Sequence, residues 1–444
     1  MTPAKQLPMF APLETSEARA AEKIVDVGPN GGENLAMSAA RNLVFVAPFP
    51  SDVTMRFVRA ASKLENTRLL GVVHSPPKGK DANVYDDKVR IQNPLSTSDI
   101  IACVEELKKR HGKIHRIIGI LEAQQVQLGQ VREHFGVEGT TADVADVFRD
   151  KSRMKAALTA AGLPVARNRL LHNLADAKSF AKEVGFPMVL KPPAGMGGKS
   201  TYRMRSVDEL VGAVGSLGVS ASNPVLAEEF LRGREFSFET FTVGGVVKVH
   251  SISHYMPTCL DAIENPWIQW CCLLPRDISG AEYAGAIKMG KAAVKALGLK
   301  DGMTHMEWFQ RPDGSLAIGE IAQRPAGANI SIMNAYAHDV DLYRAWCRAV
   351  VDGKFDAPWE RKYAVGSAFL RGMGRGRVAS VTGIKEIHQQ LGPHIVEAKL
   401  PDIGAPKNDS YEGEGYIVVR DPNTDVVKKM LETIIKTVRV SYAN

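Results

Sequence analysis

The chain has 444 residues, of which 45% are hydrophobic and 24% charged, and its formal net charge is +7 at pH 7. This composition is typical of a globular protein. Because the sequence lacks a run of about 18 apolar residues and a basic N-terminus followed by an apolar segment, we expect no membrane span, no signal peptide and a cytoplasmic protein. Lysines and arginines are scattered among carboxylates, which argues against a nucleic-acid partner and is compatible with an anionic small ligand or a basic surface.

The five cysteines are odd in number and show no CxxC spacing. Disulfide frameworks and zinc sites need paired or closely spaced cysteines. We therefore expect reduced cysteines, most of them in the core, at Cys103, Cys259, Cys271, Cys272 and Cys347.

Residues 1–38 are rich in Ala, Glu, Gly and Pro without a clear period, and we interpret them as an extension. From residue 43 onward, continuous apolar runs alternate with helical patterns of ordinary length. Strands buried on both faces that alternate with helices are typical of βαβ units around a parallel sheet. We therefore expect a Rossmann-like domain over residues 39–145. Its strands are predicted at 43–49, 68–75 and 115–123, and its helices at 54–65 and 99–112.

After residue 145 the pattern becomes mixed. Alternating stretches on either side of the Gly244-Gly245 turn predict antiparallel strands. We expect a second domain over residues 146–355, with a subdomain at about 165–230 and an α+β module at 356–444.

The stretch KPPAGMGGKS, residues 191–200, nearly matches a phosphate-binding Walker loop. Gly198-Lys199-Ser200 supplies the end of that motif, but Pro193 stands where its first glycine belongs. A Walker loop also opens a helix, whereas residues 201–205 alternate like a strand. The sequence therefore predicts a glycine loop that lies between two strands.

Pro312-Asp313-Gly314 lies between two alternating stretches and predicts a hairpin. If the hairpin closes symmetrically, Pro312 faces Ser315, and Glu307 then faces Glu320. Two carboxylates directly opposite each other repel unless a cation or a shared proton intervenes. A divalent cation is the economical explanation, and a pair of hard oxygen ligands suits Mg²⁺ better than zinc. The alternative is two solvated carboxylates on an exposed hairpin.

Arg324 follows Glu320 by an even number of residues, so an extended chain would place it on the face of the carboxylate pair. Its guanidinium could hold a carboxylate or an acyl phosphate in a two-pronged contact, or it could form a salt bridge to either glutamate. His305 lies on the same face, and we expect it to pack or to form hydrogen bonds rather than to bind a metal.

The order of these motifs resembles the ATP-grasp superfamily over roughly residues 43–350. In that superfamily the glycine loop joins two antiparallel strands of a lid that folds over ATP. The resemblance implies a fold of mixed α/β and α+β class, with an N-terminal parallel βαβ domain, a lid subdomain and a C-terminal β-rich module. The motifs that carry it are Asp150-Lys151, Val189 to Pro192, the loop 195–200, Glu228 to Leu231 with Gly233 and Glu235, and finally Glu307 and Glu320 with Arg324.

The resemblance also implies how ATP would bind. Lys151 and Lys191 would reach its phosphates from two sides, and the backbone of residues 228–231 would bind adenine. Glu235 matches the residue that usually takes the ribose hydroxyls. The full set of implied ATP contacts is Lys151, Lys191, Gly195, Gly197, Gly198, Lys199, Ser200, Glu228, Glu229, Phe230, Leu231 and Glu235.

Glu307 and Glu320 match the Mg²⁺ ligands of the superfamily, and Mn²⁺ could substitute for Mg²⁺. Many relatives carry Asn two residues after the second glutamate, where this chain has Ala322. Coordination would then depend more heavily on the two glutamates and the phosphates, so the number of Mg²⁺ ions is left open.

Within the superfamily, Thr304-His305-x-Glu307, the stretch 323–327 and the glycine-rich C-terminal region are most similar to the L-amino-acid ligases that form dipeptides. The resemblance implies that ATP phosphorylates a carboxylate, that an amine attacks the acyl phosphate, and that ADP and phosphate are released. Arg324 would steady the tetrahedral intermediate. The implied catalytic residues are Lys191, Glu307, Glu320 and Arg324, and the implied substrate contacts are Arg324, Gly327 and Ala328.

Three functions remain open from the sequence. The leading one is a carboxylate–amine ligase that acts on small molecules, without nucleic acid or membrane partners, and a homodimer is compatible with it. The second is a biotin-carboxylase-like enzyme that activates bicarbonate. The third is an inactive ATP-binding regulatory protein, against which the intact Lys191, Glu307, Glu320 and Arg324 count.

Overall fold

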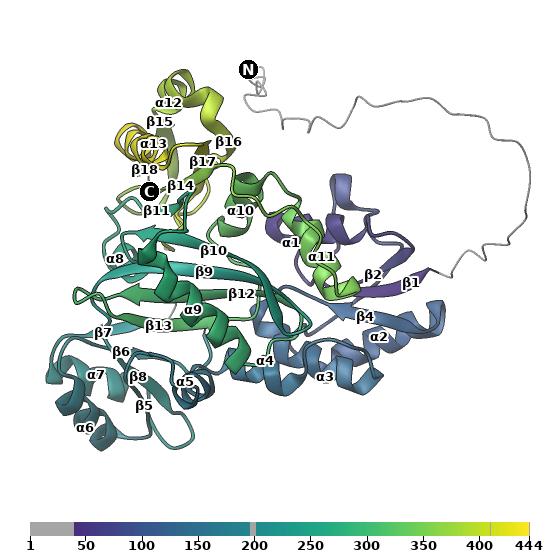
Figure 1. Cartoon of the computed structure of the whole chain (residues 1–444), viewed down its shortest axis with the longest axis horizontal. Helices are drawn as coiled ribbons and strands as arrows, with labels where there is room; N and C mark the ends of the chain where they lie inside the picture. Colours follow the sequence, from purple (N-terminus) through teal and green to yellow (C-terminus); the bar gives the residue numbers. More distant parts are fainter. Residues whose placement is uncertain (1–39, 196–200, 409, 444) are drawn as a thin grey trace, which may run out of the picture. The chain divides into compact units, whose positions relative to one another are not determined.

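The computed structural model describes residues 40–195, 201–408 and 410–443. The predicted extension 1–38 lies outside these residues. Ala40–Asn444 cluster as one compact unit. Figure 1 shows its helices and strands in sequence colours. None of the described helices is long and apolar enough to cross a membrane.

The N-terminal sheet is fully parallel, which confirms the predicted βαβ pattern. Its innermost strand is buried on both faces, since Leu43 to Val46 are at most 1% exposed. Such burial explains the continuous apolar runs. In spatial order the strands are β3 (Asp87–Arg90), β2 (Thr67–Val73), β1 (Arg41–Val46) and β4 (Ile114–Ile118).

Four helices belong to this part of the chain. Three of them begin at a residue whose side chain caps the first turn, and the fourth begins after Gln124, whose side chain makes no capping hydrogen bond. The side chain of Ser51 accepts a hydrogen bond from the Thr54 N–H, and Ser96 does the same for Asp99. A side-chain oxygen at this position satisfies one of the unpaired N–H groups of the first turn. The helices are α1 (Asp52–Ala61), α2 (Thr97–His111), α3 (Gln125–Phe135) and α4 (Ala142–Arg149), with the short 3-10 turns η1 (Gly79–Asp81) and η2 (Glu122–Gln124).

A small antiparallel sheet follows, and it carries the strands on either side of the predicted glycine loop. Residues 196–200 of that loop lie outside the described residues. In spatial order its strands are β5 (Asn168–Leu171), β8 (Val225–Glu229), β6 (Met188–Lys191) and β7 (Tyr202–Met204). The helices of this region are α5 (Lys151–Ala160), α6 (Leu174–Val184) and α7 (Val207–Ser216).

The central sheet has eight antiparallel strands and continues across the predicted boundary at residue 355, so the C-terminal residues extend the same sheet. Its strands, in spatial order, are β13 (Leu316–Ala322), β12 (Gly302–Gln310), β9 (Arg234–Val243), β10 (Val246–Met256), β11 (Cys271–Leu274), β14 (Ala364–Leu370), β17 (Gly415–Asp421) and β16 (Ile395–Lys399). A separate pair consists of β15 (Arg377–Thr382) and β18 (Arg439–Ala443).

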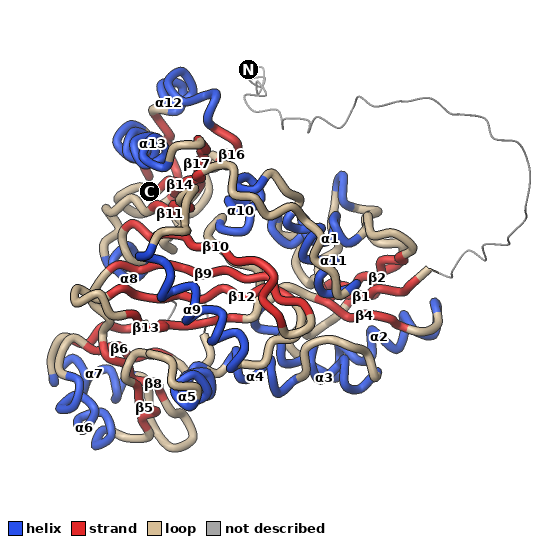
Figure 2. The backbone as a smooth tube through the Cα atoms, viewed as in Figure 1, coloured by secondary structure: helices blue, strands red, loops and turns tan. Residues whose placement is uncertain are grey.

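Helices cover the central sheet, and in Figure 2 helix α9 crosses the face of β9 and β10. Gly290 of this helix lies against the ring of Phe238, where an added Cβ would clash at 2.4 Å. A glycine therefore permits the close packing of helix and sheet. The remaining helices are α8 (Cys259–Glu264), α9 (Ala281–Ala296), α10 (Ile330–His338), α11 (Leu342–Asp352), α12 (Ile384–Leu391) and α13 (Thr424–Thr437), with the 3-10 turn η3 (Gly392–His394).

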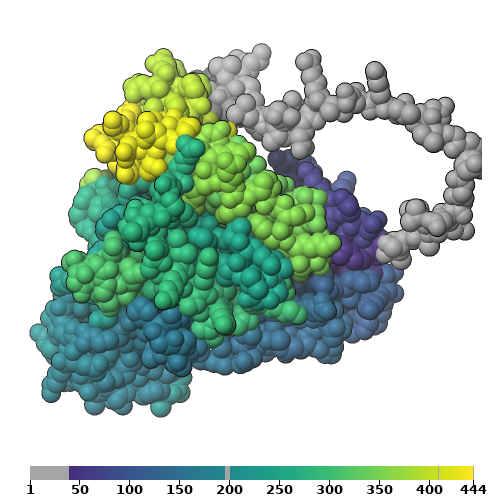
Figure 3. Space-filling model, in the orientation of Figure 1, coloured from purple at the N-terminus to yellow at the C-terminus, as the bar shows by residue number. Residues whose placement is uncertain are grey.

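The N-terminal sheet is joined to the rest of the unit by an aromatic contact with α11. Phe57 of α1 packs edge-to-face on Trp346 with ring centroids 5.1 Å apart, and both side chains are buried in one hydrophobic cluster. Figure 3 shows the segments near residues 50 and 350 side by side on the surface. Apolar burial of this kind holds Glu122, at the end of the N-terminal sheet, in a fixed position relative to the central sheet.

Three histidines in the central region should make the protein acid-sensitive. Burial lowers the pKa of His250, His254 and His338 from 6.5 to about 4 in each case. Because the folded pKa lies below the unfolded one, the stabilisation is complete above pH 6.5 and is lost as the pH falls toward 4. His338, which is only 2% exposed, should account for up to about 3 kcal/mol of that loss.

We expect the free energy of urea unfolding to fall between pH 7 and pH 5 in the wild type, and to fall less in His338→Phe. Phenylalanine keeps an aromatic ring against Trp359, on which His338 stacks with centroids 3.9 Å apart. The comparison uses the change in unfolding free energy with pH in each protein. Any loss of packing in the variant that is independent of pH therefore cancels. The same change of unfolding free energy with pH in both proteins would contradict the assignment of acid sensitivity to His338.

Candidate active site

A cavity of about 150 Å³ lies between the small sheet and the central sheet. It is lined by the ends of β6 and β8, by β12 and β13, and by the segment around α8. The sequence-predicted residues that line it are Lys151, Lys191, Gly195, Glu228, Glu229, Phe230, Leu231, Glu235, Glu307 and Glu320. Segments far apart in the chain therefore converge as the motif order implied.

Other predicted residues lie elsewhere. Gly197, Gly198, Lys199 and Ser200 belong to the segment outside the described residues. Arg324 lines a second, smaller cavity that also contains Gln323 and Trp346. Gly327 and Ala328 are absent from the lining of both cavities.

The predicted pairing of Glu307 with Glu320 is confirmed, but the turn that was expected to produce it is wrong. The hairpin closes between Arg311 and Ser315, whose backbone N–H and C=O are 2.8 Å apart, so Pro312 does not face Ser315. That closure alone would place Glu307 opposite Gly319.

A β-bulge restores the pairing. The register shifts between Glu307 and Trp308, because Trp308 pairs with Ile318 while Glu307 pairs with Glu320, which makes Gly319 the extra residue. A bulge leaves its extra residue outside the ladder of backbone hydrogen bonds. Here the Gly319 carbonyl accepts a hydrogen bond of 2.9 Å from the Lys155 Nζ.

Three lysines neutralise the acidic side chains where β6, β8 and β13 meet the cavity. Lys151 Nζ lies 2.9 Å from Glu320 Oε1, and Lys191 Nζ lies 2.9 Å from Glu228 Oε1 and 4.0 Å from Glu320 Oε2. Lys155, which is fully buried, lies 3.1 Å from the same Glu228 oxygen. The result is an alternating set of charges in which the cations are fixed before any ligand arrives.

Burial and these neighbours set the charge states. Burial alone would lower the pKa of Lys191, but Glu228 and Glu320 raise it above its ordinary value. Burial would raise the pKa of Glu320, whereas Lys151 and Lys191 hold it below its ordinary value. For Lys155 burial prevails over Glu228, and its pKa is lowered. The raised pKa keeps Lys191 protonated. The lowered pKa of Lys155 means that burial disfavours its charged form.

The resemblance implied that the backbone of Glu228 contacts adenine, but in the structure this backbone is part of the small sheet. Glu228 lies between β5 and β6, opposite Asn168 and Val189, and its carboxylate binds the two buried lysines. The adjoining Phe230 and Leu231 lie beyond the end of β8, at the cavity wall. Backbone contacts to a planar base therefore fit these two residues better than Glu228.

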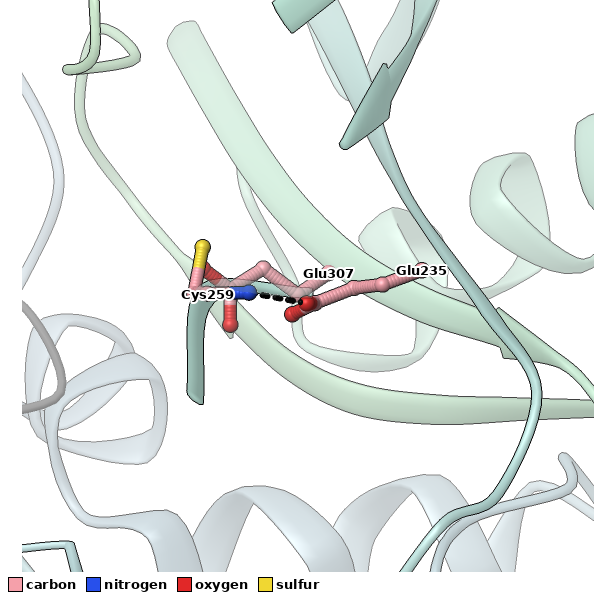
Figure 4. A group of neighbouring side chains, drawn as sticks. All are labelled: Glu235, Cys259 and Glu307. Atoms are coloured by element: carbon pink, nitrogen blue, oxygen red, sulfur yellow. Dashed lines mark hydrogen bonds between the residues drawn. The ribbon is translucent and has the colours of Figure 1, made fainter. Parts of the chain in front are cut away.

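Glu235, Cys259 and Glu307 bring three metal-ligand atoms within 4.8 Å of one another. Figure 4 shows the carboxylates beside the Cys259 backbone, whose N–H donates a 2.7 Å hydrogen bond to Glu235 Oε2. Burial and the neighbouring Glu307 raise the pKa of Glu235 well above its ordinary value. This crowding of carboxylates favours a cation or a bound proton at this point.

His305 lies beside Glu307. Its Nδ1 lies 2.9 Å from Glu239 Oε1, and its Nε2 lies 3.8 Å from Glu307 Oε1 and 3.3 Å from the Tyr255 hydroxyl. Burial would lower the pKa of His305, but hydrogen bonds to the two glutamates raise it to about 9. The expectation of a hydrogen-bonding role is confirmed.

Arg324 is paired with neither hairpin glutamate. Its Nε donates a 2.7 Å hydrogen bond to Glu122 Oε2, and its Nη1 donates to the Pro325 carbonyl at 3.0 Å. Burial would lower the pKa of Arg324, but Glu122 and Glu307 raise it. Of the three side-chain nitrogens of Arg324, Nη2 alone has no hydrogen-bond partner among the described residues. Its Nε and Nη1 are thus occupied by protein groups, and the two-pronged contact to a substrate carboxylate or acyl phosphate stays a prediction.

Ala328 is 8% exposed and packs in a hydrophobic cluster with Trp270 and Phe369. Its φ is 50° and that of the following Asn329 is 61°, both in the left-handed region that costs energy for non-glycine residues. A role in substrate choice would therefore depend on the shape of this loop more than on an open space at the Ala328 side chain.

Lys155, Glu122 and Cys259 were missed by the sequence analysis. Lys155 follows Lys151 by four residues on α5, a spacing that puts both on one helix face and could have indicated it. Glu122 follows the end of a parallel strand, where functional groups gather in α/β folds. Cys259 carried no local signal.

Comparison with known proteins agrees with this geometry. A family model described as the ATP-grasp domain matches residues 156–334. The L-arginine-specific L-amino acid ligase of Bacillus subtilis is 28% identical over 239 residues, which are 53% of this chain and 57% of that protein. The match thus spans little more than half the length of that relative.

Solved structures show the fold. The L-amino acid ligase from Bacillus licheniformis superposes with a TM-score of 0.74 at 17% identity, covering 91% of this chain and all of that one. A biotin carboxylase domain dimer of 2-oxoglutarate carboxylase from Hydrogenobacter thermophilus, in complex with MgADP, ADP and bicarbonate, has a TM-score of 0.63 at 18% identity and covers 90% of each chain. The predicted ATP-grasp fold is confirmed.

Proposed function

Since residues 156–334 of this chain are an ATP-grasp domain, we propose that the protein is an ATP-dependent ligase that joins a carboxylate to an amine, with two amino acids as the substrates. The observation that supports this most is the single cavity in which Glu307 and Glu320 face each other beside Lys151 and Lys191. Cations and carboxylates in this arrangement suit phosphoryl transfer, in which the protein mainly positions groups and neutralises charge.

In this proposal the lysines exchange partners when ATP binds. Lys151 and Lys191 would turn from Glu320 and Glu228 toward phosphate oxygens, which carry more charge than a carboxylate. The wall formed by Phe230 and Leu231 would hold the base, and Glu235 would face the ribose hydroxyls. Because the cavity is already built from these side chains, little reorganisation is needed at the moment of transfer.

The carboxylate pair fits Mg²⁺. Two hard oxygen ligands lie opposite each other on neighbouring strands, next to the space that phosphates would fill. Mg²⁺ held by Glu307 and Glu320 would neutralise charge on the transferred phosphoryl group. The thiol of Cys259 suits softer metals, so Mg²⁺ would use the oxygens alone. His305, whose Nε2 lies 3.8 Å from Glu307 Oε1, would help to hold that carboxylate in place.

Arg324 would bind the acyl group through Nη2, the terminal nitrogen that its protein contacts leave available. A carboxylate oxygen attacks the γ-phosphorus of ATP, the bond to the bridging oxygen of ADP breaks, and an acyl phosphate forms. The amine then attacks the acyl carbon, loses a proton and expels phosphate. The guanidinium stabilises the negative oxygen of the tetrahedral intermediate.

A biotin-carboxylase-like activity is the second candidate, and the similarity to the biotin carboxylase domain favours it. That reaction would need bicarbonate and biotin. A phosphate-release assay with ATP and Mg²⁺ distinguishes the candidates, with all twenty amino acids supplied singly and in pairs. We expect turnover that depends on an amino-acid pair, with a product whose mass is that of the pair less water. Stimulation by bicarbonate and biotin alone would support the second candidate.

A further inference from the structure

A continuous set of hydrogen bonds joins the phosphate end of the cavity to Arg324. Arg149 Nη1 donates to the Gly195 carbonyl at 2.8 Å and lies 2.9 Å from Glu122 Oε1. The other oxygen of Glu122 accepts from Arg324 Nε at 2.7 Å. Lys151 Nζ also donates to the Gly195 carbonyl, at 3.2 Å. Arg149 therefore stands between the start of the glycine loop and the arginine at the acyl end.

These contacts are shielded from water. The side chains of Glu122 and Arg149 are 8% and 18% exposed, and that of Arg324 is 23% exposed. Screening weakens exposed ion pairs to little or nothing, but a shielded pair that loses one partner leaves an uncompensated charge. Both Glu122 oxygens are used, one by each arginine, so removing Arg149 changes the charge that Arg324 faces.

The four groups come from separate segments. Glu122 lies in η2 beyond the N-terminal sheet, Arg149 ends α4, Gly195 follows β6, and Arg324 follows β13. No other function of Arg149 is evident from its described contacts, which are Glu122 and Gly195. Arg149 thus fixes the Gly195 carbonyl and the Glu122 carboxylate relative to each other.

We propose that Arg149 is a positioning residue that sets the orientation of Arg324 through Glu122. Because Arg149 also binds the Gly195 carbonyl, it would fix the position of Arg324 relative to the phosphate end of the site. The inference rests on the proposed function, in which Arg324 binds the acyl group. Transfer of a phosphoryl group needs the attacking oxygen aligned with the phosphorus, and misplacement by about 1 Å can cost 100-fold in rate. Arg149 would supply that alignment without touching either substrate.

The test compares Arg149→Met with Arg149→Lys. Arg149 makes both of its hydrogen bonds, to Glu122 and to the Gly195 carbonyl, through the single nitrogen Nη1. An ammonium has three donors and could make both contacts, whereas methionine has none. Arg153→Met is the matched control, since Arg153 pairs only with the surface residues Asp143 and Asp146 in the described structure.

We expect Arg149→Met to lower kcat about 100-fold, with the Kd for ATP changed less than about threefold. Arg149→Lys should restore most of the rate, and Arg153→Met should match the wild type. In a double-mutant cycle, Arg149→Met should cost little once Arg324 is already Lys, because the residue acts through Arg324. Additive effects in that cycle would overturn the proposal.

A readout that needs no turnover separates this inference from the proposed function. In arginine-labelled protein, the Arg324 Nε–H signal should exchange slowly with solvent, because Glu122 accepts its hydrogen bond. Arg149→Met should raise that exchange rate at least tenfold, and Arg153→Met should leave it unchanged. Unaltered exchange in Arg149→Met would overturn the positioning role even if the protein is a ligase. Faster exchange in a protein without ligase activity would refute only the proposed function.

Discussion

Replacing Glu307 or Glu320 with glutamine should lower the rate of ligation at least 100-fold, equivalent to about 3 kcal/mol of transition-state stabilisation. Glutamine keeps the shape of the side chain and removes its charge. The two residues are paired on neighbouring strands, and both line the cavity. Steady-state rates at saturating ATP and Mg²⁺ measure the loss directly.

The two variants should differ in stability. Glu307 crowds the buried Glu235, so Glu307→Gln should keep or raise the unfolding temperature. Glu320 compensates Lys151 and Lys191, so Glu320→Gln should lower it. Glu360→Gln changes an exposed glutamate and is the control. Activity within about threefold of the wild type in both site variants would refute the metal assignment.

Replacing Lys155 with alanine should destabilise the protein by about 3–5 kcal/mol, because Glu228 loses one of its two buried cations, the Gly319 carbonyl loses its donor and a cavity is left. Lys155 is fully buried, pairs with Glu228 and donates to the Gly319 carbonyl that the bulge leaves outside the ladder. Lys191 also binds Glu228, so the carboxylate would keep one cation. The unpaired Gly319 carbonyl and the space left by the lysine side chain would account for the rest of the loss.

Urea unfolding at pH 7 measures that loss. Lys155→Met fills the volume but leaves the Gly319 carbonyl unpaired, so its effect should lie between those of alanine and the wild type. Lys182→Met removes an exposed lysine of α6 and should change stability by less than about 0.5 kcal/mol. A loss below about 1 kcal/mol in Lys155→Ala would show that the buried contacts do not hold the hairpin.

Glu307 and Glu320 illustrate what the sequence could predict at the site. Alternation and a turn signal predicted that they lie opposite each other, because the period of a strand is regular. The turn itself was wrong by one residue, and the bulge at Gly319 compensated for it. The isolated Gly319 in the strand pattern is a signal for such a bulge. Its partner Lys155, which lies 164 residues away in sequence, could not be predicted from the hairpin.

Arg324 shows where the sequence could not suffice. An even spacing suggested that it would face the carboxylate pair, yet its hydrogen-bond partner is Glu122, 202 residues away. Contacts between segments so far apart are set by the packing of the N-terminal sheet against α11, for which a single sequence carries no direct signal. In contrast, the parallel sheet and the order of the nucleotide-site motifs follow from local patterns, and these agreed with the fold.

The central claim is that the protein activates a carboxylate by phosphorylation, and transfer of ¹⁸O tests it most directly. Amino acids labelled with ¹⁸O in the carboxylate are supplied in the pair that gives the fastest phosphate release. An acyl phosphate passes one labelled oxygen to phosphate when the amine displaces it, so we expect ¹⁸O in inorganic phosphate, unlabelled ADP, and an amide product that retains the other oxygen. Unlabelled phosphate would mean plain hydrolysis of ATP, and label in AMP would mean an acyl adenylate. Either result would contradict the proposed function.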